Sequence, residues 1–412
     1  MKAVVFTLGC KVNACESQSI IKNLEDLGYH VSVELSYADL YVINTCAVTK
    51  EAEKKSRQAI ARVKKFNKDA KIIVVGCASQ LNANNFACKD GVSLVSGTVG
   101  KSQIHKNLDK TGIDVKELTE NYEYFTTPKQ VKTRAFVKIQ DGCNNFCSYC
   151  IIPYLRGRSR SRSKESVLEE INALSALEVV LTAINVTAYN DDGSDLASLI
   201  DFIKNVDCRI RLGSIEENAI NENLLNKLSN LKNFAPHFHL SLQSGSDKVL
   251  KDMNRKYTAS AFLNGVNLIR KYFKNAGITT DVIVGYPTET EQDFLSTLDL
   301  CKKAKFSDIH PFVFSPREGT VACKLKDLSP SVKKQRLNAL IELKKQLKNE
   351  FICDNIGSVE EVILEDFDGV YTSGYTGNYI KVYVEGKMPS GSYKILLNSA
   401  YDDGAIGKVI NN

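Results

Sequence analysis

Three cysteines within eight residues form the part of this sequence with the clearest chemistry. Cys143, Cys147 and Cys150 are separated by three and then by two residues, so one short loop can bring three thiolates to a single centre. A tetrahedral zinc site needs a fourth ligand, and no other cysteine lies near in the sequence. Three thiolates on a [4Fe–4S] cube leave one iron open for a ligand from outside the protein. The spacing therefore favours an iron–sulfur cluster, and a zinc site with a distant fourth ligand is the alternative.

The cysteine loop resembles the motif of the radical S-adenosylmethionine (SAM) enzymes, in which an aromatic residue, here Tyr149, precedes the third cysteine. The resemblance implies that the amino and carboxyl groups of SAM bind the open iron. It also implies that an electron from the cluster cleaves SAM to a 5′-deoxyadenosyl radical.

Length and composition restrict the class of protein. A chain of 412 residues is long enough for two or three domains, each with its own core. Its twelve cysteines are too sparse for a disulfide scaffold, and it shows neither a signal peptide nor an apolar run of membrane-spanning length. We therefore expect a cytoplasmic protein with reduced cysteines and no membrane partner. The net charge of +6 permits an anionic partner without requiring one.

Residues 1–120 alternate between apolar strands and helical stretches, which predicts a parallel α/β domain. The strands are expected at 3–7, 39–43 and 71–75, and the helices at 16–27 and 50–66.

A cysteine follows each of these three strands, at Cys10, Cys46 and Cys77. Because parallel strands end at the same edge of a sheet, we expect the three thiolates to converge there and to hold a second [4Fe–4S] cluster. The alternative is that these cysteines end the strands as small buried apolar residues. Cys15 and Cys88 are expected to be bystanders, since three ligands already suffice.

The central segment, residues 129–352, follows a polar linker at 121–133 that contains Pro128. Six strand–helix repeats predict an open or partial (β/α) barrel, with the loop of Cys143 after the first strand, at the mouth where barrel active sites lie. The strands are expected at 135–139, 179–182, 209–212, 237–242, 279–284 and 309–314.

Polar residues near the ends of these strands are candidates to hold SAM and substrate. Glu216 follows the third strand, and Ser241 and Gln243 end the fourth. Polar residues at such positions also cap the following helix, a role that we expect for Ser246 or Asp247.

Arginines are concentrated directly after the cysteine loop, with four in seven residues. A run of charge is usually solvated surface, but this one lies beside the predicted radical site. We therefore expect a contact with the anionic backbone of an RNA from Arg156, Arg158, Arg160 and Arg162.

The last segment, residues 354–412, has short alternating strands with glycine turns and predicts a small all-β barrel after a basic helix at 329–352. It carries nine acidic and four basic residues, a charge of −5, which leaves +11 for the rest of the chain. If this barrel binds RNA, we expect aromatic contacts from Tyr375 and Tyr379.

Over nearly its whole length the chain resembles the methylthiotransferases, whose plan is an N-terminal domain with three cluster cysteines, a radical SAM domain and a C-terminal TRAM domain. It is most similar to the bacterial branch that acts on N6-threonylcarbamoyladenosine in tRNA. The matching motifs are Gly9-Cys10-Lys11-Val12-Asn13, the segment from Cys150 to Arg162, the segment from His239 to Ser246 and the segment from Met253 to Thr258. Arg255 lies in the last motif and joins Tyr149 among the predicted SAM contacts.

The resemblance implies a reaction that uses both clusters. One SAM gives a methyl group to sulfur at the cluster on Cys10, Cys46 and Cys77, and a second SAM is cleaved at the other cluster. The product is the 2-methylthio derivative of the modified adenosine at position 37, next to the anticodon. The implied partners are tRNA, a sulfur source and an electron donor such as flavodoxin or ferredoxin.

Three other functions fit the same residues. Two are methylthiolation of another tRNA adenosine and of a ribosomal-protein side chain. The third is an iron–sulfur module that binds RNA without catalysis. The chain also departs from its branch at four positions near the predicted SAM site, where Ala183 and Asn190 replace glycines, Glu217 replaces a proline and Thr288 replaces a glycine.

Overall fold

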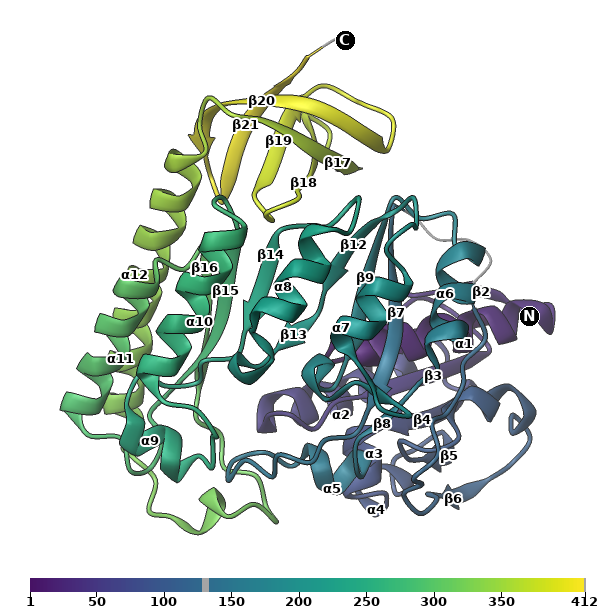
Figure 1. The fold of residues 1–412 in the computed structure, drawn as a ribbon. Helices are drawn as coiled ribbons and strands as arrows, with labels where there is room; N and C mark the ends of the chain where they lie inside the picture. Colours follow the sequence, from purple (N-terminus) through teal and green to yellow (C-terminus); the bar gives the residue numbers. More distant parts are fainter. Residues whose placement is uncertain (128–132, 411–412) are drawn as a thin grey trace.

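The computed structural model describes residues 1–127 and 133–410, which form three successive parts (Figure 1). Pro128 of the expected linker, the expected domain start at residue 129 and the last two residues lie outside the described residues. The domain boundaries 1–120, 129–352 and 354–412 stay predictions, whereas the architecture of each part follows from its strand pairing.

The N-terminal part is a parallel sheet of six strands in the order β2-β1-β3-β4-β5-β6. The expected strands are present as β1 (Lys2–Thr7), β3 (Leu40–Thr45) and β4 (Lys71–Gly76), which confirms the predicted α/β fold. The sequence analysis missed three strands. These are β2 (His30–Ser32), β5 (Val92–Ser96) and β6 (Gly112–Asp114). The two edge strands are only three residues long and lack a buried apolar face, so no alternation marks them.

Helices cover both faces of this sheet. Val5 and Val42 pack against Ile20 and Leu24 of α1 on one face. Val4 and Ile43 face α2 on the other. The helices are α1 (Lys11–Asp26), α2 (Lys50–Phe66), α3 (Cys77–Leu81), α4 (Asn84–Ala87) and the 3₁₀ helix η1 (Lys101–Lys106). α1 begins five residues earlier than expected, directly after Cys10, so its first turn lies beside the cysteine.

The central part confirms the partial barrel. Its six parallel strands are β7 (Arg134–Asp141), β9 (Glu178–Ala183), β12 (Arg209–Leu212), β14 (His237–Leu240), β15 (Gly277–Val284) and β16 (Asp308–Val313). They form two sheets, in the orders β12-β9-β7-β8 and β13-β14-β15-β16. A bridge connects Ile210 of β12 to Phe234, in the segment that leads into β14. The short strands are β8 (Arg160–Ser161), β10 (Asn190–Asp191), β11 (Ser194–Asp195) and β13 (Ser214–Ile215).

Helices separate the strands of the central part, as the strand–helix repeats predicted. They are α5 (Ile152–Arg156), α6 (Lys164–Ala173), α7 (Leu196–Phe202), α8 (Glu222–Ser229), α9 (Asp247–Asp252), α10 (Ala259–Tyr272) and α11 (Glu291–Ala304), with 3₁₀ helices η2 (Val186–Ala188), η3 (Glu217–Ala219) and η4 (Ala322–Lys324). Ser246 caps α9, as expected, by accepting a hydrogen bond from the Val249 N–H. No helix in the described residues is both long and apolar enough to cross a membrane.

The C-terminal part is a closed barrel in the order β17-β18-β19-β21-β20, which confirms the all-β expectation. Its strands are β17 (Val359–Phe367), β18 (Tyr371–Thr376), β19 (Lys381–Glu385), β20 (Gly391–Tyr401) and β21 (Gly404–Val409). Only four strands are expected from the sequence, at 359–364, 370–375, 379–384 and 393–397, and β21, which contains two glycines, is not among them. A β-carbon at Gly404 would lie 2.1 Å from the Lys381 carbonyl oxygen, so close strand packing excludes a side chain there.

The long helix α12 (Pro330–Asp354) runs along the partial barrel to the C-terminal barrel (Figure 1). Leu340, Leu343 and Leu347 join the core of the partial barrel. The C-terminal barrel lies over the amino ends of the central strands, where Gly277 at the start of β15 approaches Asn378 so closely that a β-carbon would be 2.0 Å from its carbonyl oxygen. The cysteine loop is at the opposite, carboxyl ends of these strands.

Candidate active site

The loop triad, which we define as Cys143, Cys147 and Cys150, follows the carboxyl end of β7. Cys143 and Cys147 lie close enough to add to a rise in the pKa of the Cys150 thiol, to about 12, of which burial is the main cause. Metal binding to such thiols must therefore release protons. Asn254 stabilises the loop, because its side-chain amide donates to the carbonyls of Asn145 (3.2 Å) and Phe146 (3.0 Å).

The sheet triad, which we define as Cys10, Cys46 and Cys77, lies at the carboxyl edge of the N-terminal sheet. The structure brings the three cysteines together there, as the strand-end pattern predicted. Burial, and then Cys77 and Cys10, raise the pKa of the Cys46 thiol to about 11. Gly9 has a φ of +103°, and a β-carbon there would lie 2.8 Å from Cys46 Sγ, so only glycine fits beside the cysteine.

The two remaining N-terminal cysteines lie apart from this edge. Cys15 is buried against the partial barrel, with Sγ 3.3 Å from the Phe136 carbonyl oxygen. Cys88 is exposed beside α4.

Each triad offers three thiols, the number that a [4Fe–4S] cluster with one open iron requires. Among residues 1–127 and 133–410, no three His, Cys, Asp or Glu side chains are gathered as ligands of a single metal ion. The donor set of each triad therefore fits a cluster that has one iron open to a ligand from outside the protein.

A pair of opposite charges stands beside the loop triad. Arg255 Nη1 lies 2.9 Å from Glu216 Oε1 and donates to Cys147 Sγ at 3.4 Å. Asn145, inside the cysteine loop, donates to both oxygens of Glu216 at 2.7 and 2.9 Å. Two of the predicted SAM contacts, Glu216 and Arg255, are thus brought together at the triad.

The other three predicted SAM contacts differ in what they present. Ser241 offers its backbone carbonyl, which accepts from Tyr257 (2.5 Å) and Arg255 (3.3 Å). Gln243 has a φ of +68°, and its N–H donates to the Asp281 carbonyl at 2.8 Å, which extends the pairing of β14 with β15. Tyr149 packs against a small apolar core that contains Met253, Tyr286 and Phe314, and this packing anchors the cysteine loop.

Comparison with known proteins decides the family. Two family models match, the radical SAM superfamily over residues 137–301 and the uncharacterized protein family UPF0004 over residues 2–97. The threonylcarbamoyladenosine tRNA methylthiotransferase MtaB of Bacillus subtilis is 37% identical over 94% of this chain and 91% of its own length. The enzyme of the same name from Thermotoga maritima is 38% identical over 98% of this chain and 96% of its own. This chain belongs to the radical SAM methylthiotransferase family.

Further likenesses fit within this family and this fold. A tRNA-2-methylthio-N(6)-dimethylallyladenosine synthase of Thermoanaerobacter sp. is 35% identical over 87% of this chain and 81% of its own. The solved radical SAM methyltransferase TsrM of Kitasatospora setae has a TM-score of 0.58 at 12% identity, over 84% of this chain and 89% of that one. At that identity the likeness concerns the fold alone, and it supports the partial barrel.

Sequence reasoning missed several residues of this methylthiotransferase site. Asn145 and Asn185 both donate to Glu216, and Tyr257 accepts from Arg255 Nε at 3.1 Å. The signal was present for two of them, because Asn145 lies within the cysteine loop and Tyr257 within the motif from Met253 to Thr258. Asn185 follows β9, and no sequence pattern near it indicates its contact with Glu216.

The structure corrects the expectation of an arginine surface after the loop triad. Arg156, Arg160 and Arg162 are all buried, and each pairs with a carboxylate: Arg156 with Glu16 and Asp141, Arg160 with Asp141, and Arg162 with Glu170. Only Arg158 is exposed, with its guanidinium 4.6 Å from the centre of the Phe146 ring. Three of the four side chains are thus unavailable to RNA, because ion pairs with buried carboxylates hold them inside.

Tyr375 and Tyr379 also lie elsewhere than on an open face of the C-terminal barrel. Their rings stack at 4.7 Å, and Tyr379 stacks on His237 of β14 at 4.6 Å. Arg211 of β12 lies 4.7 Å from the Tyr379 ring and donates to the Gly377 carbonyl at 2.9 Å. Both tyrosines are half-buried where the C-terminal barrel meets the partial barrel. The structure therefore gives them a part in docking, and RNA contact stays a prediction.

Proposed function

We propose that this chain converts N6-threonylcarbamoyladenosine in tRNA, at position 37 next to the anticodon, to its 2-methylthio derivative. The observation that carries the proposal is the presence of two complete cysteine triads in a chain that aligns almost end to end with relatives named for this reaction. A tRNA-binding module without catalysis would have no use for the second triad.

The chain's own residues have distinct roles in this proposal. Cys10, Cys46 and Cys77 would hold the auxiliary cluster, and the loop triad would hold the cluster that binds SAM. When bound, these groups supply the one-electron cleavage of SAM and the sulfur that is transferred. No side chain need act as a strong nucleophile toward C2 of the adenine.

Glu216 and Arg255 would orient SAM, because its amino-acid end carries a hydrogen-bond donor and a carboxylate. The amino group would donate to Glu216 and the carboxylate would accept from Arg255. The cavity beside the pair measures about 30 Å³, which is room for about one water. The ion pair must therefore open when SAM binds, and each partner would exchange the other for a group of the ligand.

The reaction also needs partners that the chain does not contain. An electron donor such as flavodoxin or ferredoxin would reduce the SAM-binding cluster, and a sulfur source would replenish the auxiliary cluster. With tRNA and these partners, the reaction would take place in the cytoplasm.

The second candidate substrate is N6-dimethylallyladenosine at the same tRNA position, which relatives 34–35% identical to this chain carry in their names. Mass spectrometry of tRNA nucleosides from cells with and without the gene separates the two. We expect the deletion strain to lose the 2-methylthio form of threonylcarbamoyladenosine and to accumulate its precursor. Loss of the dimethylallyl product alone would assign the second substrate, and an unchanged nucleoside profile would refute both.

A further inference from the structure

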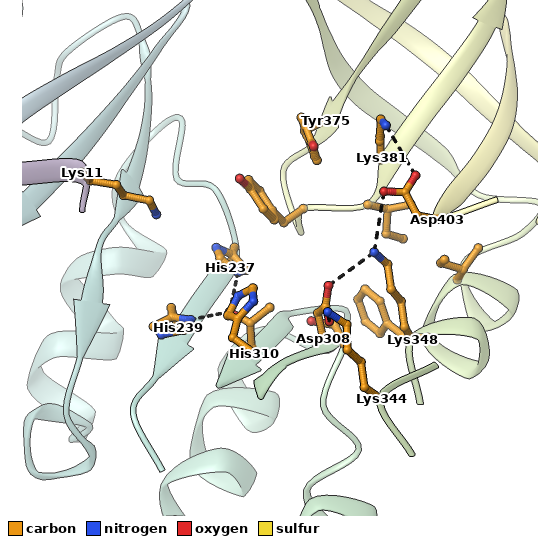
Figure 2. Close-up of a pocket in the computed structure, with 16 residues that line it drawn as sticks. Lys11, His237, His239, Asp308, His310, Lys344, Lys348, Tyr375, Lys381 and Asp403 are labelled. Carbon is orange, nitrogen blue, oxygen red and sulfur yellow. Dashed lines mark hydrogen bonds and ion pairs between the residues drawn. The ribbon is translucent and has the colours of Figure 1, made fainter. Parts of the chain in front are cut away.

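A cavity of about 430 Å³ lies where the three parts of the chain meet. Figure 2 shows Lys11 of α1 reaching toward it from the N-terminal part, above the histidines of β14 and β16. On the far side, Tyr375 and Lys381 of the C-terminal barrel and Lys344 and Lys348 of α12 close it. Nothing in the predicted SAM or cluster chemistry uses this cavity.

The cavity lining is positively charged. It contains four lysines and two aspartates, and the aspartates form ion pairs with three of the lysines. Asp308 pairs with Lys344 (3.2 Å) and Lys348 (3.3 Å), and Asp403 pairs with Lys381 (3.5 Å). Lys11, the fourth lysine, makes no hydrogen bond or ion pair within residues 1–127 and 133–410.

Lys11 is exposed to the solvent of the cavity and has no carboxylate partner among the described residues. The two other cations on this side, Arg211 and Arg134, both pair with Glu178. A carboxylate bound at Lys11 would accept a charge-assisted hydrogen bond from its ammonium group.

His310 provides a second free polar group in the cavity. It is exposed on β16, its ring centre is 5.5 Å from that of His239, and it makes no hydrogen bond to the described residues. The neighbouring His239 is already occupied, with Nδ1 2.9 Å from Thr279 Oγ1 and Nε2 3.3 Å from Asp281 Oδ2. His237 shares the same threonine hydroxyl and stacks beneath Tyr379.

We propose that this cavity binds the free carboxylate of the N6-threonylcarbamoyl group, with Lys11 as its counter-ion and His310 as a second polar contact. The inference rests on the proposed function and names the residues that select its substrate. The threonyl end of this nucleoside carries a carboxylate and a hydroxyl, whereas a dimethylallyl group is wholly apolar and would leave the lysine unpaired. Lys11 follows Cys10 directly, so the selecting charge is next to the triad proposed to supply sulfur.

The test compares three variants with wild type. Lys11→Gln removes the charge and Lys11→Arg keeps it. Lys65→Gln removes an exposed lysine of α2 that does not line the cavity. Each protein is given the same tRNA in three forms, with threonylcarbamoyladenosine, with dimethylallyladenosine and with unmodified adenosine. Two quantities are measured for each form, the affinity of the anticodon stem-loop in the absence of SAM and kcat/KM for the methylthio product.

We expect Lys11→Gln to lose roughly ten- to a hundredfold in both quantities for the threonylcarbamoyl form, which corresponds to one hydrogen bond to a charged group. Affinity for the other two forms should fall by less than about twofold. Lys11→Arg should retain most of the selectivity and Lys65→Gln all of it. His310→Gln, which lies on β16 and away from both triads, should weaken the same preference.

Two outcomes would overturn the inference. An equal loss for all three tRNA forms would show that Lys11 binds a backbone phosphate, and unchanged selectivity in both Lys11→Gln and His310→Gln would show that neither residue reads the substituent. Iron content per chain identifies a variant that fails to fold or load, and His310→Gln then decides the matter. If wild type itself ignores the threonylcarbamoyl tRNA, the proposed function fails as well, which the wild-type measurement shows separately.

Discussion

Arg156 Nη1 lies 2.9 Å from Glu16 Oε1, and both side chains are completely buried between the N-terminal sheet and the segment after the loop triad. Arg156 Nη2 also donates to Asn13 Oδ1 at 2.8 Å. Asn13 in turn donates to the carbonyls of Leu8 and Thr45, in the loops that carry Cys10 and Cys46. A single arginine therefore connects the segment after one triad to the loops of the other.

Three cations surround the buried Glu16 carboxylate. Burial alone would raise the pKa of the Glu16 carboxyl, but Arg156, Lys101 and Lys138 outweigh it and hold that pKa well below its usual range. Lys101 lies 2.6 Å and Lys138 2.7 Å from the Glu16 carboxylate. These buried ion pairs of Glu16 thus connect the segments that carry the two proposed cluster sites.

The first prediction concerns metal content. Anaerobic reconstitution should load about eight irons per chain, four for each proposed cluster. Replacing Cys143, Cys147 and Cys150 together with alanine should halve this number, since the sheet triad remains. Iron and zinc analysis of both proteins checks this, and tightly bound zinc in the wild type would contradict the cluster assignment.

The second prediction separates the roles of the two triads. A variant with alanine at Cys10, Cys46 and Cys77 should still cleave SAM to 5′-deoxyadenosine, because the loop triad is intact. It should form no methylthiolated tRNA, because the proposed sulfur-carrying site is lost. Cys88→Ala, at an exposed cysteine outside both triads, is the matched control and should change neither product. Full product formation by the triple variant would reduce the sheet triad to a structural role.

The third prediction distinguishes a buried arginine from an exposed one. Arg156→Met leaves Glu16 without one partner inside the protein and should lower the free energy of unfolding by roughly 3–5 kcal/mol. Arg158→Gln should leave stability unchanged and weaken tRNA binding, with a decrease of about one unit at most in the log–log salt slope. Denaturation curves and a salt series of tRNA affinity measure the two effects. A stable Arg156→Met protein would show that the network is dispensable.

The fourth prediction concerns how the C-terminal barrel docks. Glu178 of β9 lies 2.7 Å from Arg209 Nε and 2.8 Å from Arg211 Nη2, and these arginines donate to backbone carbonyls of β17, of β18 and of the turn after it. Glu178→Gln should release the arginines and loosen the barrel, which protease sensitivity between α12 and β17 would report. Iron content should be unchanged, because Glu178 pairs with arginines and contacts no cysteine of either triad. Equal protease resistance would mean that the acidic barrel docks without Glu178.

The same contact carries a pH dependence of known sign. Burial would raise the pKa of Glu178, but Arg211, Arg209 and Arg134 outweigh burial and lower it from 4.5 to about 2. Because the folded pKa is the lower one, the stabilisation is complete above the unfolded pKa of 4.5 and is lost as the pH falls toward about 2. The denaturation midpoints of wild type and Glu178→Gln should therefore converge over this range. A difference in midpoint that stays constant over this pH range would show that the substitution acts through packing and not through the charge of Glu178.

Several features could be predicted because their signal is local. The spacing of Cys143, Cys147 and Cys150 sets the reach of one loop. The alternation of strands and helices likewise fixes a parallel sheet whose carboxyl edge gathers Cys10, Cys46 and Cys77. Three of the missed strands, β2, β6 and β21, are too short or too rich in glycine for a local pattern to mark them.

The sequence by itself determined the two cysteine triads, the order of the three parts and the partial barrel, since each depends on neighbours along the chain or on a strand period. Only the tertiary structure decided which charged side chains are exposed to solvent and which are buried. Arg156 meets Glu16 across 140 residues, and Tyr379 finds His237 on another part of the chain. A charged or aromatic side chain looks the same in the sequence whether it is solvated or buried, because the partner that decides between the two is brought to it by folding.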